Sequence, residues 1–310
     1  MRVIVADVLG MCFGVRDALK RIEEVTEPEL VTIHGELVHN ELVLGNLRGR
    51  GFAMAAETGR GGVAATPTVL ITAHGVSDVE RRRLVGEGKR LVDTTCPLVT
   101  RVHRAAQELQ EAGYFVLVVG RRGHVEVRGI VEDLHAFEVI GDADEVRTYP
   151  QDRIGIVCQT TTAERRAKQV LEAVGAFNPH AEIRFVDTVC HPTKDHQRAL
   201  ERLLDEVEAL VVVGGRNSNN TRELVALSRE RGVPALHVQG PDDLDPEFFR
   251  NVAIVGLTAG TSTLDSTIAE VRNALTRREL SGNEKGAERP PHPFLDTAVP
   301  PRGLEPRSLG

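Results

Sequence analysis

Short apolar runs rich in β-branched residues alternate with longer amphipathic stretches along most of this chain. The apolar runs have the length and composition of buried strands, and the clearest occupy residues 2–7, 69–75, 115–120 and 209–215. Charged stretches with apolar residues at helical spacing follow them, at 15–25, 77–91, 126–134 and 221–232. This alternation predicts an α/β fold whose strands are mostly parallel and buried.

One arrangement occurs three times along the chain. Cys12, Cys96 and Cys190 stand 84 and 94 residues apart, and the phrases "VDTTC" and "VDTVC" that end at the second and third cysteine are nearly identical. A strand-like run that ends in glycine follows each cysteine after 23, 24 or 25 residues. Four positions beyond these glycines stand His39, His124 and Asn219. Repetition in the same order predicts three similar units in one chain.

A second polar loop follows another strand in each unit. It contains His74 in the first unit, Thr160 in the second and Ser262 in the third. Ligands of open α/β sheets bind beyond the carboxyl ends of the strands, so we expect these loops at the edge of a site. Three pseudo-symmetric α/β units arranged as a trefoil bring the three cysteines together at their centre. We expect these units at 1–95, 96–189 and 190–279, followed by a disordered, proline-rich tail at 280–310.

Composition and charge exclude several classes of function. The net charge of −7 and the low aromatic content of 4% disfavour a non-specific nucleic-acid binder, which needs a basic surface or stacking platforms. No apolar run approaches the roughly 18 residues that span a bilayer. We therefore expect a cytoplasmic protein without a nucleic-acid or membrane partner. Disulfides are rare in that compartment, so its four cysteines are expected to be thiols or metal ligands.

The three repeated cysteines favour an iron–sulfur cluster over other metal centres. Each stands where a strand ends and a helix is expected to begin, a position that favours the metal-binding thiolate. Zinc usually takes four protein ligands in close pairs, and the chain has no such pair. A [4Fe–4S] cluster accepts distant ligands, and three cysteines leave its fourth iron open for a substrate. Cys158 lies outside the repeat, and we expect an ordinary buried strand residue there unless a fourth ligand exists.

The strand-end loops are rich in neutral hydrogen-bond donors. Such donors suit an anion with many acceptor oxygens, for example a phosphate or a diphosphate. The candidate donors are His39, Asn40, His74, His124, Ser218, Asn220 and Ser262. Glu126 lies two residues after His124 and is either a solvated carboxylate or a proton donor beside the metal centre.

Nine dispersed motifs closely resemble the LytB-type 4-hydroxy-3-methylbut-2-enyl diphosphate reductases. They occur in the order "GMCFGV", "HGELVHN", "ITAHGV", "DTTCPLVTRVH", "GHVEVRG", "QTTT", "DTVCHPT", "GGRNSNNT" and "LTAGTSTLD", across about residues 1 to 275. The resemblance implies a trefoil around a central [4Fe–4S] cluster. It also implies reductive removal of the substrate's hydroxyl, which gives isopentenyl and dimethylallyl diphosphates in the last step of the non-mevalonate pathway.

The resemblance also implies a role for individual residues. Cys12, Cys96 and Cys190 take the positions of the cluster ligands, and Glu126 takes the position that delivers protons. The substrate-binding positions fall on His39, His74, His124, Thr160, Ser218, Asn219, Asn220 and Ser262. The chain carries no flavin or nicotinamide fingerprint, so we expect an external electron donor of the ferredoxin or flavodoxin type.

Two other interpretations also fit part of the pattern. A zinc-dependent phosphate-ester enzyme could use the three cysteines together with a histidine. A non-enzymatic iron–sulfur sensor would need the cysteines but neither Glu126 nor the histidines.

Overall fold

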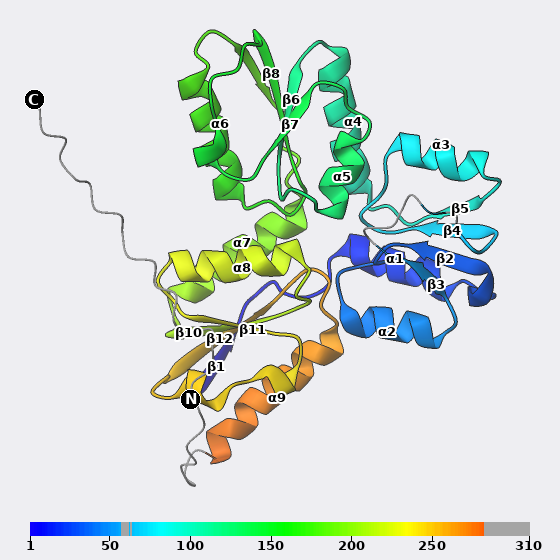
Figure 1. The fold of residues 1–310 in the computed structure, drawn as a ribbon. Coiled ribbons are helices and arrows are strands. Elements are labelled where there is room, and N and C mark those ends of the chain that lie inside the picture. Colours follow the sequence, from blue (N-terminus) through cyan, green and yellow to red (C-terminus); the bar gives the residue numbers. More distant parts are fainter. Residues whose placement is uncertain (57–61, 63, 282–310) are drawn as a thin grey trace, which may run out of the picture.

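Three separate parallel sheets build the fold. The computed structural model describes residues 1–281 except 57–61 and 63, and Figure 1 shows three lobes that meet at the centre of the molecule. The first sheet contains β2 (Val31–His34), β3 (Ala53–Ala55), β4 (Thr68–Ile71) and β5 (Arg90–Asp93). The second contains β6 (Phe115–Val119), β7 (Phe137–Ile140), β8 (Arg153–Cys158) and β9 (Glu182–Phe185). The third contains β10 (Ala209–Val213), β11 (Ala235–Val238), β12 (Ile254–Ala259) and β1 (Arg2–Val5).

The strand order is the same in all three sheets. The orders are β3-β2-β4-β5, β7-β6-β8-β9 and β11-β10-β12-β1, and every pairing is parallel. In the first two sheets the earliest strand is interior, the next lies on one side, and the third and fourth lie on the other. The α/β class with three parallel-sheet units is therefore confirmed.

Strand β1 closes the third sheet. It pairs with β12 in a register from Arg2 opposite Ile254 to Val5 opposite Leu257. Residues 1–95 were expected in the first unit, and this is wrong for Arg2–Val5, which belong to the third sheet. The reason is positional: β1 occupies the edge place that β5 and β9 occupy in the other two sheets, and each of these three strands precedes a repeated cysteine.

Helices cover both faces of each sheet. They are α1 (Phe13–Glu23), α2 (Glu41–Gly49), α3 (Asp78–Gly86), α4 (Pro97–Glu111), α5 (Val125–Val131), α6 (Glu164–Phe177), α7 (His191–Leu204), α8 (Asn219–Glu230) and α9 (Asp265–Ser281). Short 3-10 turns lie at Pro28–Leu30, Ala143–Glu145, Pro241–Asp243 and Pro246–Phe249. None of the helices in the described part of the chain is long and apolar enough to cross a bilayer.

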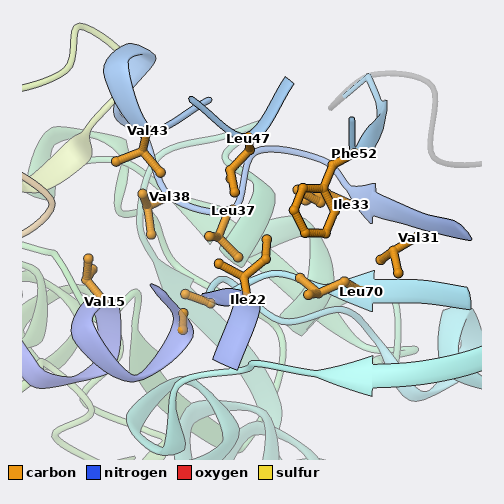
Figure 2. Packing of buried hydrophobic residues seen from close by; sticks show 12 residues of the cluster. Val15, Ile22, Val31, Ile33, Leu37, Val38, Val43, Leu47, Phe52 and Leu70 are labelled. Carbon is orange, nitrogen blue, oxygen red and sulfur yellow. The ribbon is translucent and has the colours of Figure 1, made fainter. Parts of the chain in front are cut away.

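The helix after each repeated cysteine packs on the next sheet. Figure 2 shows Ile22 of α1 packed with Ile33 of β2 and Leu70 of β4, all fully or almost fully buried. In the same way α4 packs on the second sheet and α7 on the third. Burying each such aliphatic side chain contributes about 1.5–3 kcal/mol, so the helices are fixed firmly to the sheets. Each cysteine is thus the junction between a strand of one unit and a helix of the next.

A glycine shortens the helix expected within residues 77–91. The stretch 77–91 is helical only as far as Gly86, because Gly88 adopts a φ of 76° and ends the helix before β5 begins at Arg90. The expected tail at 280–310 lies outside the described residues from 282 onward, and α9 extends through Ser281.

Candidate active site

The three repeated cysteines lie at equivalent positions around one pocket. Cys12, Cys96 and Cys190 are the N-cap residues of α1, α4 and α7, as expected from their place between strand and helix. Each cysteine N–H donates to a carbonyl oxygen in a strand-end loop: that of Thr261 for Cys12 at 3.0 Å, Ala73 for Cys96 at 3.1 Å and Thr160 for Cys190 at 3.0 Å. The same bond, made three times, fixes every cysteine beside a polar loop.

The pocket brings together the predicted cluster ligands, the predicted substrate-binding residues and Glu126. Its lining contains Cys12, Cys96, Cys190, Glu126, His39, His74, His124, Thr160, Ser218, Asn219, Asn220 and Ser262. Asn40, another candidate donor, is not in this lining, because its side chain caps α2 and donates to the carbonyl of Ser262 at 2.8 Å. Sequence reasoning missed an apolar wall, to which Val15, Leu98 and Pro192 belong. The signal was available, because these residues occupy the first turns of the three helices that the cysteines cap and so face the same centre.

Burial sets the protonation of the three thiols. It raises the pKa of Cys12 and Cys96, and it raises the pKa of Cys190 to about 12. Backbone N–H groups of the helix first turns, such as those of Gly14 and Val15 at Cys12, lower the pKa but are outweighed by desolvation. The expected thiolate is therefore not produced by the helix N-terminus alone. A bound metal cation lowers a thiol pKa far enough to remove the proton.

Gly14 makes room for the sulfur of Cys96. A Cβ atom at Gly14 would lie 2.6 Å from Cys96 Sγ and 3.2 Å from Cys96 Cβ. Only a residue without a side chain therefore lets α1 pass so close to this cysteine, which belongs to the next junction. The two junctions are packed against each other at the pocket.

The fourth cysteine does not line the pocket. Cys158 at the end of β8 is fully buried in the core of the second unit, and it is not among the pocket-lining residues. Burial raises its pKa to about 12, as it does at Cys190, so position and not pKa distinguishes Cys158 from the repeated cysteines. This placement agrees with the expected ordinary strand residue. Among the described residues no three His, Cys, Asp or Glu side chains converge closely enough to hold a single metal ion.

Three histidine rings form one side of the pocket. His39 stacks on His74 with ring centroids 4.2 Å apart, and the edge of His124 meets both rings at 5.2 and 5.9 Å. Glu36 contacts His39 Nδ1 at 2.7 Å, and this contact lowers the pKa of the carboxyl. The other nitrogen, His39 Nε2, is buried without a partner among the described residues. That nitrogen can bond to a ligand, as donor or acceptor according to the protonation of the ring.

The loops that follow Gly35, Gly120 and Gly215 do not align as expected. Asn40, His124 and Ser218 are the side-chain caps of α2, α5 and α8, whereas counting four residues from glycine had matched His39, His124 and Asn219. The distance from glycine to cap is five, four and three residues in the three units. A fixed offset therefore misaligns the first and third loops by one position each.

The neutral donors have different partners. Asn220 Oδ1 accepts from the N–H of Thr261 at 3.0 Å, and its buried Nδ2 has no partner among the described residues. Ser262 Oγ donates to the carbonyl of His39 at 3.2 Å, and Asn219 Nδ2 donates to Thr161 Oγ1 at 3.0 Å. Asn219 and Ser262 thus also join loops of different units. Asn220 and His39 present the unsatisfied polar atoms.

Glu126 is the one charged side chain among the described residues that line the pocket. Its Oε1 accepts from the N–H of Thr160 at 2.6 Å, and its Oε2 accepts from Thr160 Oγ1 at 2.9 Å. Its own N–H donates to His124 Nδ1 at 3.2 Å. Burial raises the pKa of Glu126 to about 7, although the bonds from Thr160 oppose the shift. A carboxyl held in one orientation with this pKa is suited to transferring a proton near neutrality.

The pocket can bind an anion without a cation of its own. None of its described lining residues is lysine or arginine. An anion there would be held by imidazole, amide and hydroxyl donors, together with the positive N-terminal end of α8 at Ser218. Neutral donors of this kind suit an anion with many acceptor oxygens.

The sequence was compared with protein families and known proteins. The model of the LytB protein family matches residues 3–276. The 4-hydroxy-3-methylbut-2-enyl diphosphate reductase of Aquifex aeolicus is 33% identical over 283 residues, which are 88% of this chain and 95% of that protein. The protein of the same name from Methylibium petroleiphilum is 32% identical over 295 residues, covering 91% and 89% of the two chains.

Solved structures of the same kind share the fold. The E-1-hydroxy-2-methyl-but-2-enyl-4-diphosphate reductase of Plasmodium falciparum superposes with a TM-score of 0.81 at 26% identity, covering 89% of this chain and 88% of that one. A second structure, of (E)-4-hydroxy-3-methyl-but-2-enyl diphosphate reductase, gives a TM-score of 0.61 at 32% identity, covering 89% and 100%. It is described as the terminal enzyme of the non-mevalonate pathway.

Proposed function

This chain belongs to the LytB protein family, and from that premise we propose that its pocket holds a [4Fe–4S] cluster and reduces 4-hydroxy-3-methylbut-2-enyl diphosphate. The chain is an oxidoreductase of the terminal step of the non-mevalonate pathway, as its relatives are. One observation supports the proposed chemistry most strongly. Three cysteine junctions, a buried carboxyl of pKa about 7 and a set of neutral donors line the same pocket.

The donor set and the packing fit such a cluster. Cys12, Cys96 and Cys190 are the proposed ligands, and the missing side chain at Gly14 leaves space beside the Cys96 sulfur. Soft thiolates are the ligands that iron–sulfur clusters take, and three of them leave one iron open. When bound, the cluster would pass the two electrons of the reduction on one at a time and would offer an open iron to the substrate. The rest of the chemistry falls to the chain's own residues.

The substrate's two halves match two sides of the pocket. We assign the diphosphate to His39, His74, His124, Thr160, Ser218, Asn219, Asn220 and Ser262, all of which line the pocket. Within this set, Asn220 Nδ2 is a buried donor that still lacks an acceptor, and His39 Nε2 is buried without a partner among the described residues. An unpaired buried donor costs about 1–3 kcal/mol, and a diphosphate oxygen would remove that cost. The apolar wall of Val15 and Leu98 suits the hydrocarbon part.

Glu126 is the proposed proton donor. The reduction breaks the C–O bond, consumes two electrons and two protons, and releases the hydroxyl as water. Thr160 orients both carboxyl oxygens of Glu126, and a pKa of about 7 keeps a proton available there near neutrality. A proton from Glu126 turns the departing hydroxyl into water. The second proton goes to one of two allylic carbons, which gives the isopentenyl or the dimethylallyl product.

The electrons are proposed to come from outside the chain. The sequence has no flavin or nicotinamide fingerprint, so a carrier of the ferredoxin or flavodoxin type must deliver them one at a time. We place the enzyme in the cytoplasm, because thiols that serve as metal ligands need a reducing compartment.

Anaerobic reconstitution with iron and sulfide tests the function. With dithionite-reduced methyl viologen as donor, the brown protein should convert 4-hydroxy-3-methylbut-2-enyl diphosphate to isopentenyl and dimethylallyl diphosphates. A brown protein without turnover would favour the iron–sulfur sensor. A colourless protein that retains zinc and hydrolyses phosphate esters would favour the zinc enzyme.

Gly14→Ala should lower the iron content of the reconstituted protein several-fold. The added Cβ would lie 2.6 Å from Cys96 Sγ, so the sulfur must move away from its position at the pocket. Alanine is the best helix former, so α1 itself should not be harmed. Iron and sulfide content per chain, measured with far-UV circular dichroism, separates loss of the cluster from loss of fold.

Gly45→Ala is the matched control. Gly45 is also helical, in α2, and a Cβ there meets nothing within 4 Å. This variant should keep its iron and gain up to about 1 kcal/mol of stability. Full iron occupancy in Gly14→Ala would show that the Cys96 sulfur does not need its present position.

A further inference from the structure

A second groove reaches the cysteine junctions from the outer surface. It is lined by Leu98, Arg101, Asp187, Thr188, Val189, Cys190, His191 and Lys194. Cys190 and Leu98 line both this groove and the central pocket. A single layer of side chains therefore separates the groove from the proposed cluster site. We call it the Arg101 groove.

An exposed pair of rings lies beside the Arg101 groove. Phe13 follows Cys12, is 39% exposed and stacks on His191, with ring centroids 5.5 Å apart and an interplanar angle of 7°. Phe13 also lines the central pocket, and His191 lines the groove. The stack thus spans from the pocket to the outer surface at two of the three cysteine junctions. A large exposed aromatic side chain in such a place is typical of an interaction surface.

The groove is locally basic on an acidic protein. Arg101 and Lys194 line it against one carboxylate, Asp187, which gives the lining a formal charge of +1 in a chain whose net charge is −7. Lys194 pairs with Asp187, whereas Arg101 is exposed and has no carboxylate partner among the described residues. The guanidinium of Arg101 donates to the carbonyl of Asp187 at 3.1 Å, which holds it at the rim.

A third cation lies next to the ring pair. Arg16 stands three residues after Phe13 on α1, and its guanidinium lies 3.5 Å from Asp265. Each of the three helices that begin at a proposed ligand thus carries a cation in its first turns: Arg16 on α1, Arg101 on α4 and Lys194 on α7. Since Arg16 is paired with Asp265 and Lys194 with Asp187, Arg101 is the cation that would attract an acidic partner to this face.

We propose that the Arg101 groove is the docking surface for an acidic one-electron carrier protein, which delivers electrons toward Cys190. This inference rests on the proposed reductase function. The rate of electron transfer falls steeply with distance. The carrier must therefore dock where only Cys190 and Leu98 separate the groove from the central pocket. Electron carriers form transient complexes with small interfaces. A few charges and an exposed ring pair are enough to orient the carrier in such a complex. Arg101 supplies the unpaired charge, and the Phe13–His191 stack supplies the apolar contact.

Arg101→Glu tests the docking surface with two electron donors. With a reduced acidic [2Fe–2S] ferredoxin as donor, kcat/KM for the carrier should fall at least about tenfold at low ionic strength. With methyl viologen, a small dye that needs no docking surface, turnover should stay within about twofold. Arg101→Lys should retain most of the ferredoxin rate. Direct binding of the ferredoxin to the reconstituted protein, measured by isothermal titration calorimetry, should weaken by a similar factor in Arg101→Glu. Arg82→Glu on α3 makes the same charge change at an exposed site outside the groove and should leave both rates unchanged.

Ionic strength gives an independent measurement on the unaltered protein. The ferredoxin-driven kcat/KM should fall as salt screens the attraction, and the methyl viologen rate should not. Unchanged ferredoxin kinetics in Arg101→Glu, or an equal loss with both donors, would overturn the docking surface. Absence of methyl viologen turnover in the unaltered protein would instead overturn the reductase function, so the two failures are distinguishable.

Discussion

Glu126→Gln should lower kcat by about 10²- to 10⁴-fold and leave iron content and substrate affinity unchanged. The substitution removes the transferable proton but keeps the size and most of the hydrogen-bonding capacity of the side chain. Its amide oxygen can still accept from the N–H of Thr160, as Glu126 Oε1 does at 2.6 Å. Single-turnover kinetics with methyl viologen, together with substrate titration, measure the two effects separately.

The pH profile of kcat should identify the same group. Burial raises the pKa of Glu126 to about 7, so the proton-bearing form decreases as the pH rises through 7. The rate of the unaltered enzyme should fall on that alkaline side, and the residual rate of Glu126→Gln should lack this inflection. Glu223→Gln is the control, since Glu223 is another buried carboxyl of raised pKa but lies outside the pocket, paired with Arg166. Full turnover in Glu126→Gln would remove the carboxyl from the mechanism.

The repeat accounts for what the sequence could predict. A strand, a cysteine and a helix follow one another at residues 12, 96 and 190, and the hydrophobic pattern around them specifies local elements. Because the three segments are similar, they build sheets of the same strand order, and equivalent junctions meet at the centre. The polar residues at the strand ends then reach one pocket, since parallel strands present their carboxyl ends on one side.

Other features depend on tertiary contacts that no local pattern contains. Arg2–Val5 reads as a strand in the sequence, but its pairing with β12 follows from the closure of the third sheet. The close approach of Gly14 to Cys96 joins two segments more than 80 residues apart, and a glycine in an amphipathic stretch gives no sign of it. The pKa of Glu126 likewise arises from burial in the folded chain, whereas the segment GHVEVRG alone is compatible with a solvated carboxylate.

Cys12→Ser, Cys96→Ser and Cys190→Ser should each lose nearly all of the cluster. A serine oxygen is a harder and more weakly acidic ligand than a thiolate, and each of the three junctions contributes a single cysteine. Iron and sulfide content after anaerobic reconstitution, with the visible absorbance, measures the loss. Zinc content in the same samples distinguishes a cluster from a zinc site, which would retain its metal under these conditions.

Cys158→Ser separates the role of the ligands from that of buried sulfur in general. Cys158 is fully buried in the core of the second unit, so a hydroxyl there should cost about 1–3 kcal/mol of stability. The variant should unfold at lower denaturant concentration and still contain full iron, whereas the other three should lose iron with smaller effects on the fold of the apoprotein. Cys158 lies outside the pocket lining, so it does not have the position of a ligand. A folded but colourless Cys158→Ser protein would therefore overturn the ligand assignment, because it would require the core of the second unit to open onto the cluster.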